Sequence, residues 1–117
     1  MKPNKLYGMI GLARKAGKTV CGTPLICLAL RKEKAPLLVL VSTGASEGTK
    51  NKLRFKCEFY RVPYTLIDCP TAELAHIVGK TGEIAAVAIT DENFAKAILS
   101  TAELTGKDGT VTEAPKQ

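Results

Sequence analysis

The sequence of 117 residues contains no tryptophan, one histidine, and only six tyrosines and phenylalanines together. This scarcity of aromatic rings argues against a platform on which single-stranded nucleic acid would stack its bases. No uninterrupted apolar run approaches the roughly 20 residues that a membrane-spanning helix requires. A secretory leader is not expected either, because Arg14 and Lys15 interrupt the first amphipathic stretch. We therefore expect a cytoplasmic protein without a membrane partner.

The cysteines lack the spacing of a metal site. Cys21, Cys27, Cys57 and Cys69 form no C-x-x-C pair, and His76 is the single histidine. Four-ligand zinc sites normally place such ligands in pairs at short intervals. We therefore expect four free thiols in a reducing compartment, with no metal and no other cofactor.

Acidic residues are scarce in the first half of the chain. Residues 1–61 hold 13 lysines and arginines against three glutamates, a net charge of +10. Residues 62–117 hold four basic and eight acidic residues, a net charge of −4, so the whole chain carries +6. A one-sided positive field attracts polyanions, of which nucleic acid and an anionic membrane surface are the natural examples. The alternative is a basic protein that its lysines merely keep soluble.

The hydrophobic pattern alternates between helices and strands, which is typical of a layered α/β fold. We predict helices over 4–16, 23–33, 46–60, 71–78 and 91–102, and strands over 19–21, 37–41, 64–67 and 84–89. Thr23 is the predicted N-cap of the second helix, with Pro24 in its first position. The expected fold is a compact three-layer α/β/α sandwich with a four-stranded mixed sheet. It forms one domain over residues 1–104, followed by a disordered tail over 105–117.

Two sequence patterns imitate catalytic motifs. Residues 44–48 match the G-x-S-x-G nucleophile elbow, and Ser46, Asp68 and His76 follow in the order of a hydrolytic triad. The simpler interpretation makes Ser46 a helix N-cap, whereas a hydrolase requires the three side chains to converge. Residues 17–19 and 79–81 each read Gly-Lys-Thr but lack the earlier glycine of a phosphate-binding P-loop. We therefore assign no catalytic residue and expect a protein that is not an enzyme.

The predicted helix over 46–60 carries the clearest binding signal. Lys50 and Arg54 lie on one flank of its apolar seam, and Lys52 lies on the other. The helix begins beside the glycine-containing loop 42–46, so free backbone N–H groups and basic side chains come close together. Phosphate oxygens suit such a place, although a solvated helix face would show the same pattern. Phe55 and Phe59 lie away from the seam, where they pack on a neighbouring element or form a small partner patch.

Several segments come in an order and spacing that resemble a known family. They are residues 11–18, Gly22, and residues 29–32, 37–41, 45–53 and 57–64. The chain resembles the kink-turn RNA-binding ribosomal-protein family of the large-subunit seven-Ae and thirty-e type, and within it the bacterial YlxQ-like branch.

This resemblance implies an α/β/α sandwich that binds sharply bent RNA at tandem sheared G·A pairs. The implied contacts are three regions that match residues 22–28, 42–50 and 79–84. The resemblance and the basic residues together predict a monomer that binds ribosomal or other kink-turn RNA, not DNA. The candidate RNA-binding residues are Arg14, Lys15, Lys18, Gly22, Thr23, Ser46, Thr49, Lys50, Lys52, Arg54, Lys80, Thr81 and Gly82.

The chain departs from the family pattern where base-reading side chains are expected. The second helix of the family typically carries Asn, Glu and Lys there, but this sequence has Pro24, Leu25 and Leu28, and Gly44 replaces an acidic residue of the next loop. Leucine cannot hydrogen-bond the edge of a guanine. The alternative function is therefore a protein–protein interaction module on the same fold with degenerate RNA readout. That alternative predicts that Leu25, Leu28 or Phe55 is exposed.

Overall fold

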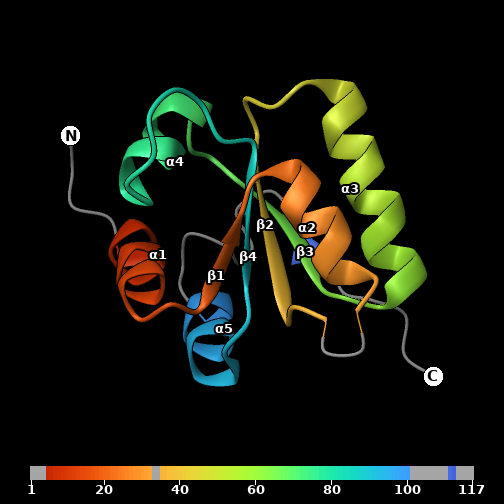
Figure 1. Ribbon diagram of the computed structural model, residues 1–117, viewed down its shortest axis with the longest axis horizontal. Helices are drawn as coiled ribbons and strands as arrows, with labels where there is room; N and C mark the ends of the chain where they lie inside the picture. Colours follow the sequence, from red (N-terminus) through yellow and green to blue (C-terminus); the bar gives the residue numbers. More distant parts are fainter. Residues whose placement is uncertain (1–4, 33–34, 101–110, 113–117) are drawn as a thin grey trace.

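The computed structural model describes residues 5–32, 35–100 and 111–112 (Figure 1). Helices and strands alternate along the chain, as the hydrophobic pattern predicted. The helices are α1 (Lys5–Lys15), α2 (Thr23–Leu30), α3 (Glu47–Tyr60), α4 (Thr71–Ile77) and α5 (Glu92–Leu99). The strands are β1 (Thr19–Cys21), β2 (Leu38–Ser42), β3 (Tyr64–Ile67), β4 (Ala86–Ile89) and β5 (Val111–Thr112).

The strands form one mixed sheet in the order β1-β4-β2-β3-β5. β2 and β3 run parallel, and every other pair is antiparallel. The four strands predicted from the sequence make up the body of this sheet, so the predicted fold class is confirmed. β5 was not predicted, because two residues without an apolar period give no sequence signal; they pair with Tyr64 and Thr65 of β3. The rest of the predicted tail, like the domain boundary at 104, lies outside the described residues.

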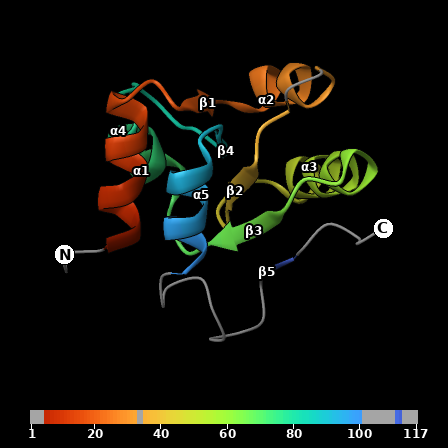
Figure 2. The same ribbon diagram turned by 90° about the horizontal axis from the view of Figure 1, so that it is seen from below.

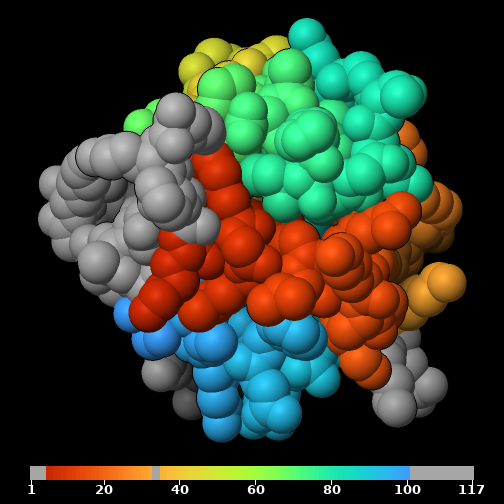
Figure 3. Space-filling view, turned by 90° about the vertical axis from the view of Figure 1, so that its left-hand side faces the viewer, coloured from red at the N-terminus to blue at the C-terminus, as the bar shows by residue number. Residues whose placement is uncertain are grey.

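The helices cover both faces of the sheet and complete three layers (Figure 2). On one face α1, α4 and α5 pack on Leu38 and Leu40 of β2, and on the other α2 and α3 pack on Val39 and Val41. Figure 3 shows the outer surface of the first face, where α1 lies between α4 and α5. Successive side chains of a strand point to opposite faces. This burial on both faces explains the continuous apolar runs of the two central strands, β2 and β4.

The start of α2 differs by one residue from the prediction. Gly22, not Thr23, is the N-cap, and its φ of 94° lies in a region that only glycine adopts easily. Thr23 is therefore the first helical residue and Pro24 the second, a place where the missing N–H of proline costs little. The helix ends at Leu30, and residue 33, the last one of its predicted range, lies outside the described residues.

The start of β4 also differs from its predicted range. The apolar run begins at Ile84, but the strand begins at Ala86. The reason is that the N–H of Ile84 donates to the carbonyl oxygen of Thr71, at 3.1 Å, instead of to a neighbouring strand. Within the described residues no helix is both long and apolar enough to cross a membrane.

Candidate nucleic-acid interface

Three segments meet at one end of the sheet: the start of α2, the loop between β2 and α3, and the loop that leads into β4 (Figure 1). Two backbone hydrogen bonds hold them together. The N–H of Gly22 donates to the carbonyl oxygen of Ala86 at 3.0 Å, and the N–H of Ser42 donates to that of Ala85 at 2.8 Å. The beginning of β4 therefore lies between the two helix-entry segments. These are the three regions that the sequence resemblance implied, and the fold makes them neighbours.

The start of α2 offers backbone donors to solvent. The N-cap Gly22 has no side chain to accept a hydrogen bond, and Pro24 has no N–H. In the part of the chain that the structure describes, the N–H groups of Thr23 and Leu25 have no acceptor, and the first intrahelical bond runs from Ile26 to Gly22. Unpaired N–H groups at a helix start attract anions such as phosphate.

The start of α3 is occupied by its own polar groups. The Ser46 hydroxyl accepts the N–H of Thr49 at 3.2 Å and donates to the Thr49 hydroxyl at 3.1 Å. Lys50, whose side chain is 18% exposed, pairs with Glu47 at 3.3 Å. This pair offsets the charge of the lysine in the unbound protein, so Glu47 weakens the attraction of Lys50 for a phosphate.

The two other α3 cations that were predicted to meet RNA, Arg54 and Lys52, differ in their partners. Arg54 lies 3.7 Å from Glu58, and its guanidinium stacks 4.7 Å from the centre of the Phe55 ring. Lys52 is exposed and, among the described residues, has no ion pair. Of the α3 residues predicted to meet RNA, Lys52 is thus the one that offers an unneutralised charge.

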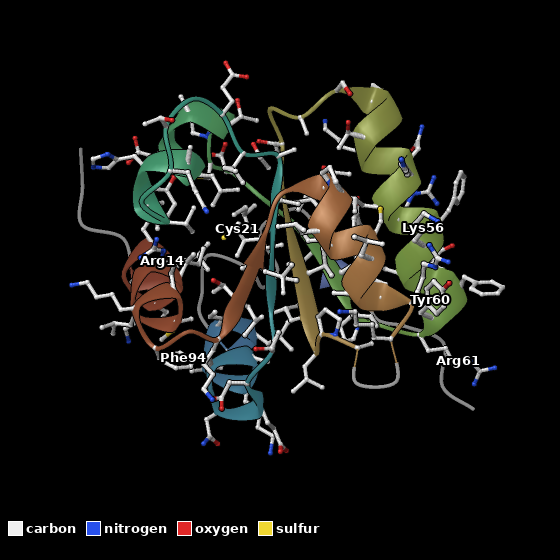
Figure 4. All side chains as sticks on the ribbon, viewed as in Figure 1. Arg14, Cys21, Lys56, Tyr60, Arg61 and Phe94 are labelled. Atoms are coloured by element: carbon white, nitrogen blue, oxygen red, sulfur yellow. The ribbon has the colours of Figure 1, made fainter. Side chains whose placement is uncertain are left out.

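A groove of about 450 Å³ lies between the end of α1, the strand β1 and the exposed side of α2. Val20, Cys21, Leu25 and Leu28 give it apolar walls. Its basic side chains are Arg14, Lys32 and Lys80, and Figure 4 shows Arg14 on one side of Cys21 with α2 on the other.

The groove brings together basic residues that are far apart in the sequence. Arg14 and Lys80 were both predicted to bind RNA, and the Arg14 guanidinium packs beside Gly79, 3.5 Å from where a side-chain Cβ would be. Lys32 was missed by the sequence reasoning. Its spacing of four residues from Leu28 was the available signal, since residues that far apart share a helix face.

The remaining predicted residues divide between the two ends of the sheet. Thr81 and Gly82 are exposed in the loop that leads into β4, the strand whose first residue, Ala86, accepts the N–H of Gly22. Lys15 and Lys18 are also exposed, but the carbonyl oxygen of Lys18 accepts the N–H of Thr90 beyond the far end of β4. Because a strand advances about 3.3 Å per residue, Lys18 lies roughly 13 Å along the strand direction from Gly22.

The triad-like residues do not form a catalytic arrangement. Ser46 is the N-cap of α3, as the simpler interpretation predicted. Ser46, Asp68 and His76 are all exposed, and within the described residues no hydrogen bond joins any two of them. The same residues contain no group of three side chains placed to hold a metal ion.

Large apolar side chains are exposed on three helices, and Leu12 of α1 is 58% exposed. Leu25 and Leu28 of α2 are 56% and 52% exposed, and Phe55 and Phe59 of α3 are 57% and 77% exposed. α2 buries only Ile26 and Leu30, because three or four residues per turn bring only one stripe of a surface helix against the sheet. The alternative function, a protein interaction module, predicted exposure at Leu25, Leu28 or Phe55.

Residues 4–99 match the sequence model of the Ribosomal protein L7Ae/L30e/S12e/Gadd45 family. The chain belongs to this family. Two similar proteins are each named RNA-binding protein YlxQ. That of Bacillus subtilis (strain 168) is 36% identical over 94 residues, covering 80% of this chain and 91% of the relative. That of Enterococcus faecium is 39% identical over 93 residues, covering 79% and 85% respectively.

The fold of this L7Ae/L30e/S12e/Gadd45 family member also resembles a solved structure. It is that of a protein of unknown function from Bacillus halodurans C, with a TM-score of 0.76 and 26% sequence identity. The match covers 84% of this chain and 96% of the other. Family, relatives and fold therefore agree with the resemblance found in the sequence.

Proposed function

We propose that this protein binds structured RNA of the kink-turn type and is not an enzyme. The observation that carries the proposal is the meeting of three segments around the start of β4, through the Gly22–Ala86 and Ser42–Ala85 hydrogen bonds. In the family that this chain belongs to, two similar proteins are named as RNA-binding. The partner is ribosomal or another structured RNA, which a cytoplasmic monomer binds without a cofactor.

The chemistry of a kinked RNA fits this end of the sheet. A sharp bend crowds phosphates, and each phosphate oxygen accepts hydrogen bonds and carries negative charge. The unpaired N–H groups of Thr23 and Leu25 serve as donors, while Lys52 and Lys80 supply charge. Thr81 and Gly82 then lie where a splayed nucleotide would touch the loop.

The exposed leucines decide how the RNA is read. Leu25 and Leu28 present apolar surface where the family pattern has polar base-reading groups, so they cannot discriminate guanine by hydrogen bonds. Recognition therefore rests on the backbone shape of the RNA and on its phosphates. We infer that the protein prefers bent RNA over straight RNA but tolerates changes of base sequence within the bend.

A fluorescence anisotropy titration tests the proposal. The two probes are a kink-turn RNA and a duplex in which Watson–Crick pairs replace the G·A pairs. We expect the kink-turn to bind about tenfold or more tightly, and Lys80→Glu to weaken it by a similar factor through charge repulsion.

The matched control is Lys96→Glu on α5, because Lys96 is exposed and lies away from the three segments, paired with Glu92 at 3.1 Å. This variant makes the same change of charge and should bind the kink-turn almost as tightly as the unmodified protein. Equal binding of both RNAs, unaffected by Lys80→Glu, would refute structure-specific recognition.

A further inference from the structure

β1 leaves one side of its backbone unpaired. It lies at the edge of the sheet and pairs only with β4, with Val20 opposite Ala88. In an antiparallel pair, every second residue of a strand directs its backbone N–H and C=O toward the partner strand. The bonds from Gly22 to Ala86 and from Thr90 to Lys18 show that Gly22 and Lys18 face β4, so Val20, two residues from each, faces β4 as well. The N–H and C=O groups of Thr19 and Cys21 therefore face outward. None of these four groups has a backbone partner within residues 5–32, 35–100 and 111–112.

The groove runs beside this open edge. Figure 2 shows β1 at the outer side of the sheet, with α1 on one flank and α2 on the other. A strand added to β1 would extend the sheet, and its alternate side chains would point toward the two flanks. On the α2 flank they would meet Leu25 and Leu28, and on the α1 flank they would meet Arg14 and Lys80.

The charge of the groove indicates which polar side chains a bound peptide would carry. Among the described residues, Arg14, Lys32 and Lys80 line the groove and no acidic side chain does. None of the three forms an ion pair with another described residue. An occupant that carries carboxylates on the α1 flank is therefore favoured over a neutral or basic one.

The chemistry of the edge favours a peptide over RNA. Thr19 and Cys21 present donors and acceptors in the order of a strand edge, which the backbone of a peptide strand matches. RNA phosphates only accept hydrogen bonds, and the donors of RNA lie on its bases and 2′-hydroxyl groups. The apolar wall consists of aliphatic and thiol side chains, and none of the described residues that line the groove is an aromatic one on which a base would stack.

We propose that a segment of a partner protein binds here as an added β-strand along β1. The segment is an extended peptide in which apolar side chains, directed to Leu25 and Leu28, alternate with acidic side chains directed to Arg14 and Lys80. This interaction is additional to the RNA contact at the start of α2 and does not depend on it. Leu25, Leu28 and Lys80 line the groove and also belong to the surface proposed to face RNA.

Amide hydrogen exchange tests the proposal. The probe is a terminally blocked octapeptide of alternating valine and glutamate, added to the ¹⁵N-labelled full chain. Exchange at Thr19 and Cys21 should slow on binding, while Val20, which already pairs with β4, should change little. A peptide of alternating valine and lysine should give no protection. Unprotected Thr19 and Cys21 amides at saturating valine–glutamate peptide would overturn the proposal.

Two variants locate the peptide on the two flanks. Leu28→Glu should weaken binding about tenfold or more, because it places a charge against apolar side chains and opposite the glutamates. Phe55→Glu is the control, since Phe55 is exposed to a similar degree but lies on α3, outside the groove. Arg14→Glu should weaken the valine–glutamate peptide and strengthen the valine–lysine peptide. Affinities that none of these changes alters would contradict the assigned site.

RNA provides the competing outcome. If kink-turn RNA protects the Thr19 and Cys21 amides and the peptide does not, the groove belongs to the RNA interface and the added-strand proposal is wrong. If the peptide protects them in the chain that also binds RNA, both surfaces exist. Failure of RNA binding would not affect the peptide result, so the two proposals fail separately.

Discussion

At the scale of single residues, Ser46 illustrates how a catalytic motif and a structural cap use the same residue type. The sequence places it in a nucleophile-elbow pattern, and the structure uses its hydroxyl to accept the Thr49 N–H. The pattern of residue types was thus compatible with two roles. The local one was realised because a serine just before a helix satisfies an orphan N–H without help from the rest of the fold.

The first prediction concerns this cap. Ser46→Ala should lower the free energy of unfolding by about 1 kcal/mol, because the Thr49 N–H loses its acceptor. Ser46→Asp should retain most of the stability, since a carboxylate also caps and favours the positive end of the helix. Urea denaturation followed by circular dichroism measures both. A Ser46→Ala protein as stable as the unmodified chain would contradict the role of the hydroxyl.

The second prediction concerns Cys57, which is buried between α3 and the sheet. Burial raises the pKa of its thiol from 9.0 to about 12. The folded chain therefore holds this proton more tightly than the unfolded chain. The resulting stability is fully present below pH 9 and is lost as the pH rises toward 12.

Cys57→Ala should lower stability at pH 8 by leaving a small cavity but should flatten the decline above pH 9. Urea titrations of both proteins between pH 8 and pH 11 measure the two slopes. Parallel declines would show that the thiol does not contribute to the pH dependence.

At the scale of elements, α2 is where local sequence and tertiary structure differ most. Its threonine and proline predicted a conventional capped start, and instead Gly22 takes the cap position with a φ of 94°. The N–H of Gly22 donates to the carbonyl oxygen of Ala86, so the residue that caps the helix is also held by β4. A contact between residues 64 positions apart therefore fixed the boundary, and no local pattern encodes it.

The third prediction compares two glycines. Gly22→Ala should lower the free energy of unfolding by about 2 kcal/mol, because alanine is strained at this φ. Gly8→Ala, inside α1, should raise it by about 0.5 to 1 kcal/mol, because alanine favours a helix interior. A Cβ at either position meets no atom within 4 Å, so crowding contributes to neither value. Thermal or urea unfolding should give opposite signs; the same sign would contradict the assigned backbone conformation.

At the scale of the whole molecule, the charge difference between the two halves of the chain does not become a single basic face. Lys50 and Arg54 are paired with glutamates of their own helix, and Lys18 lies away from the α2 start. The cations left for a partner include Lys52 beside the RNA-facing segments, and Arg14, Lys32 and Lys80 in the groove. In the folded protein, therefore, part of the positive charge of the sequence is paired internally and part remains for a partner.

The fourth prediction concerns salt. The logarithm of the RNA binding constant should fall linearly with the logarithm of salt concentration, because bound cations release counterions from the RNA. Lys80→Ala should reduce the magnitude of this slope by about 1. Lys96→Ala should leave the slope unchanged. Anisotropy titrations at four salt concentrations measure it, and identical slopes for the first variant and the unmodified chain would remove Lys80 from the phosphate contacts.

The sequence by itself determined the elements and the family. Continuous apolar runs over the two central strands, helical spacing in the segments between them, and the ordered segments from residue 11 to residue 64 predicted the sandwich and its relatives. These features are local or are carried by order along the chain, so they can be read without coordinates. The N-cap at Ser46 belongs to the same class, because a side chain and an N–H three residues away decide it.

Tertiary structure alone decided which parts meet. The register of β1 on β4 set which backbone groups of Thr19 and Cys21 face outward, and a shift of one residue would have exposed Val20 instead. Because α2 packs on the sheet through a single stripe of its surface, Leu25 and Leu28 remain exposed. Folding also brings Lys32 and Lys80 to one groove. β5 likewise exists only through its pairing with β3. Each of these depends on contacts between distant residues, and the free energy of such contacts is not encoded in any local pattern.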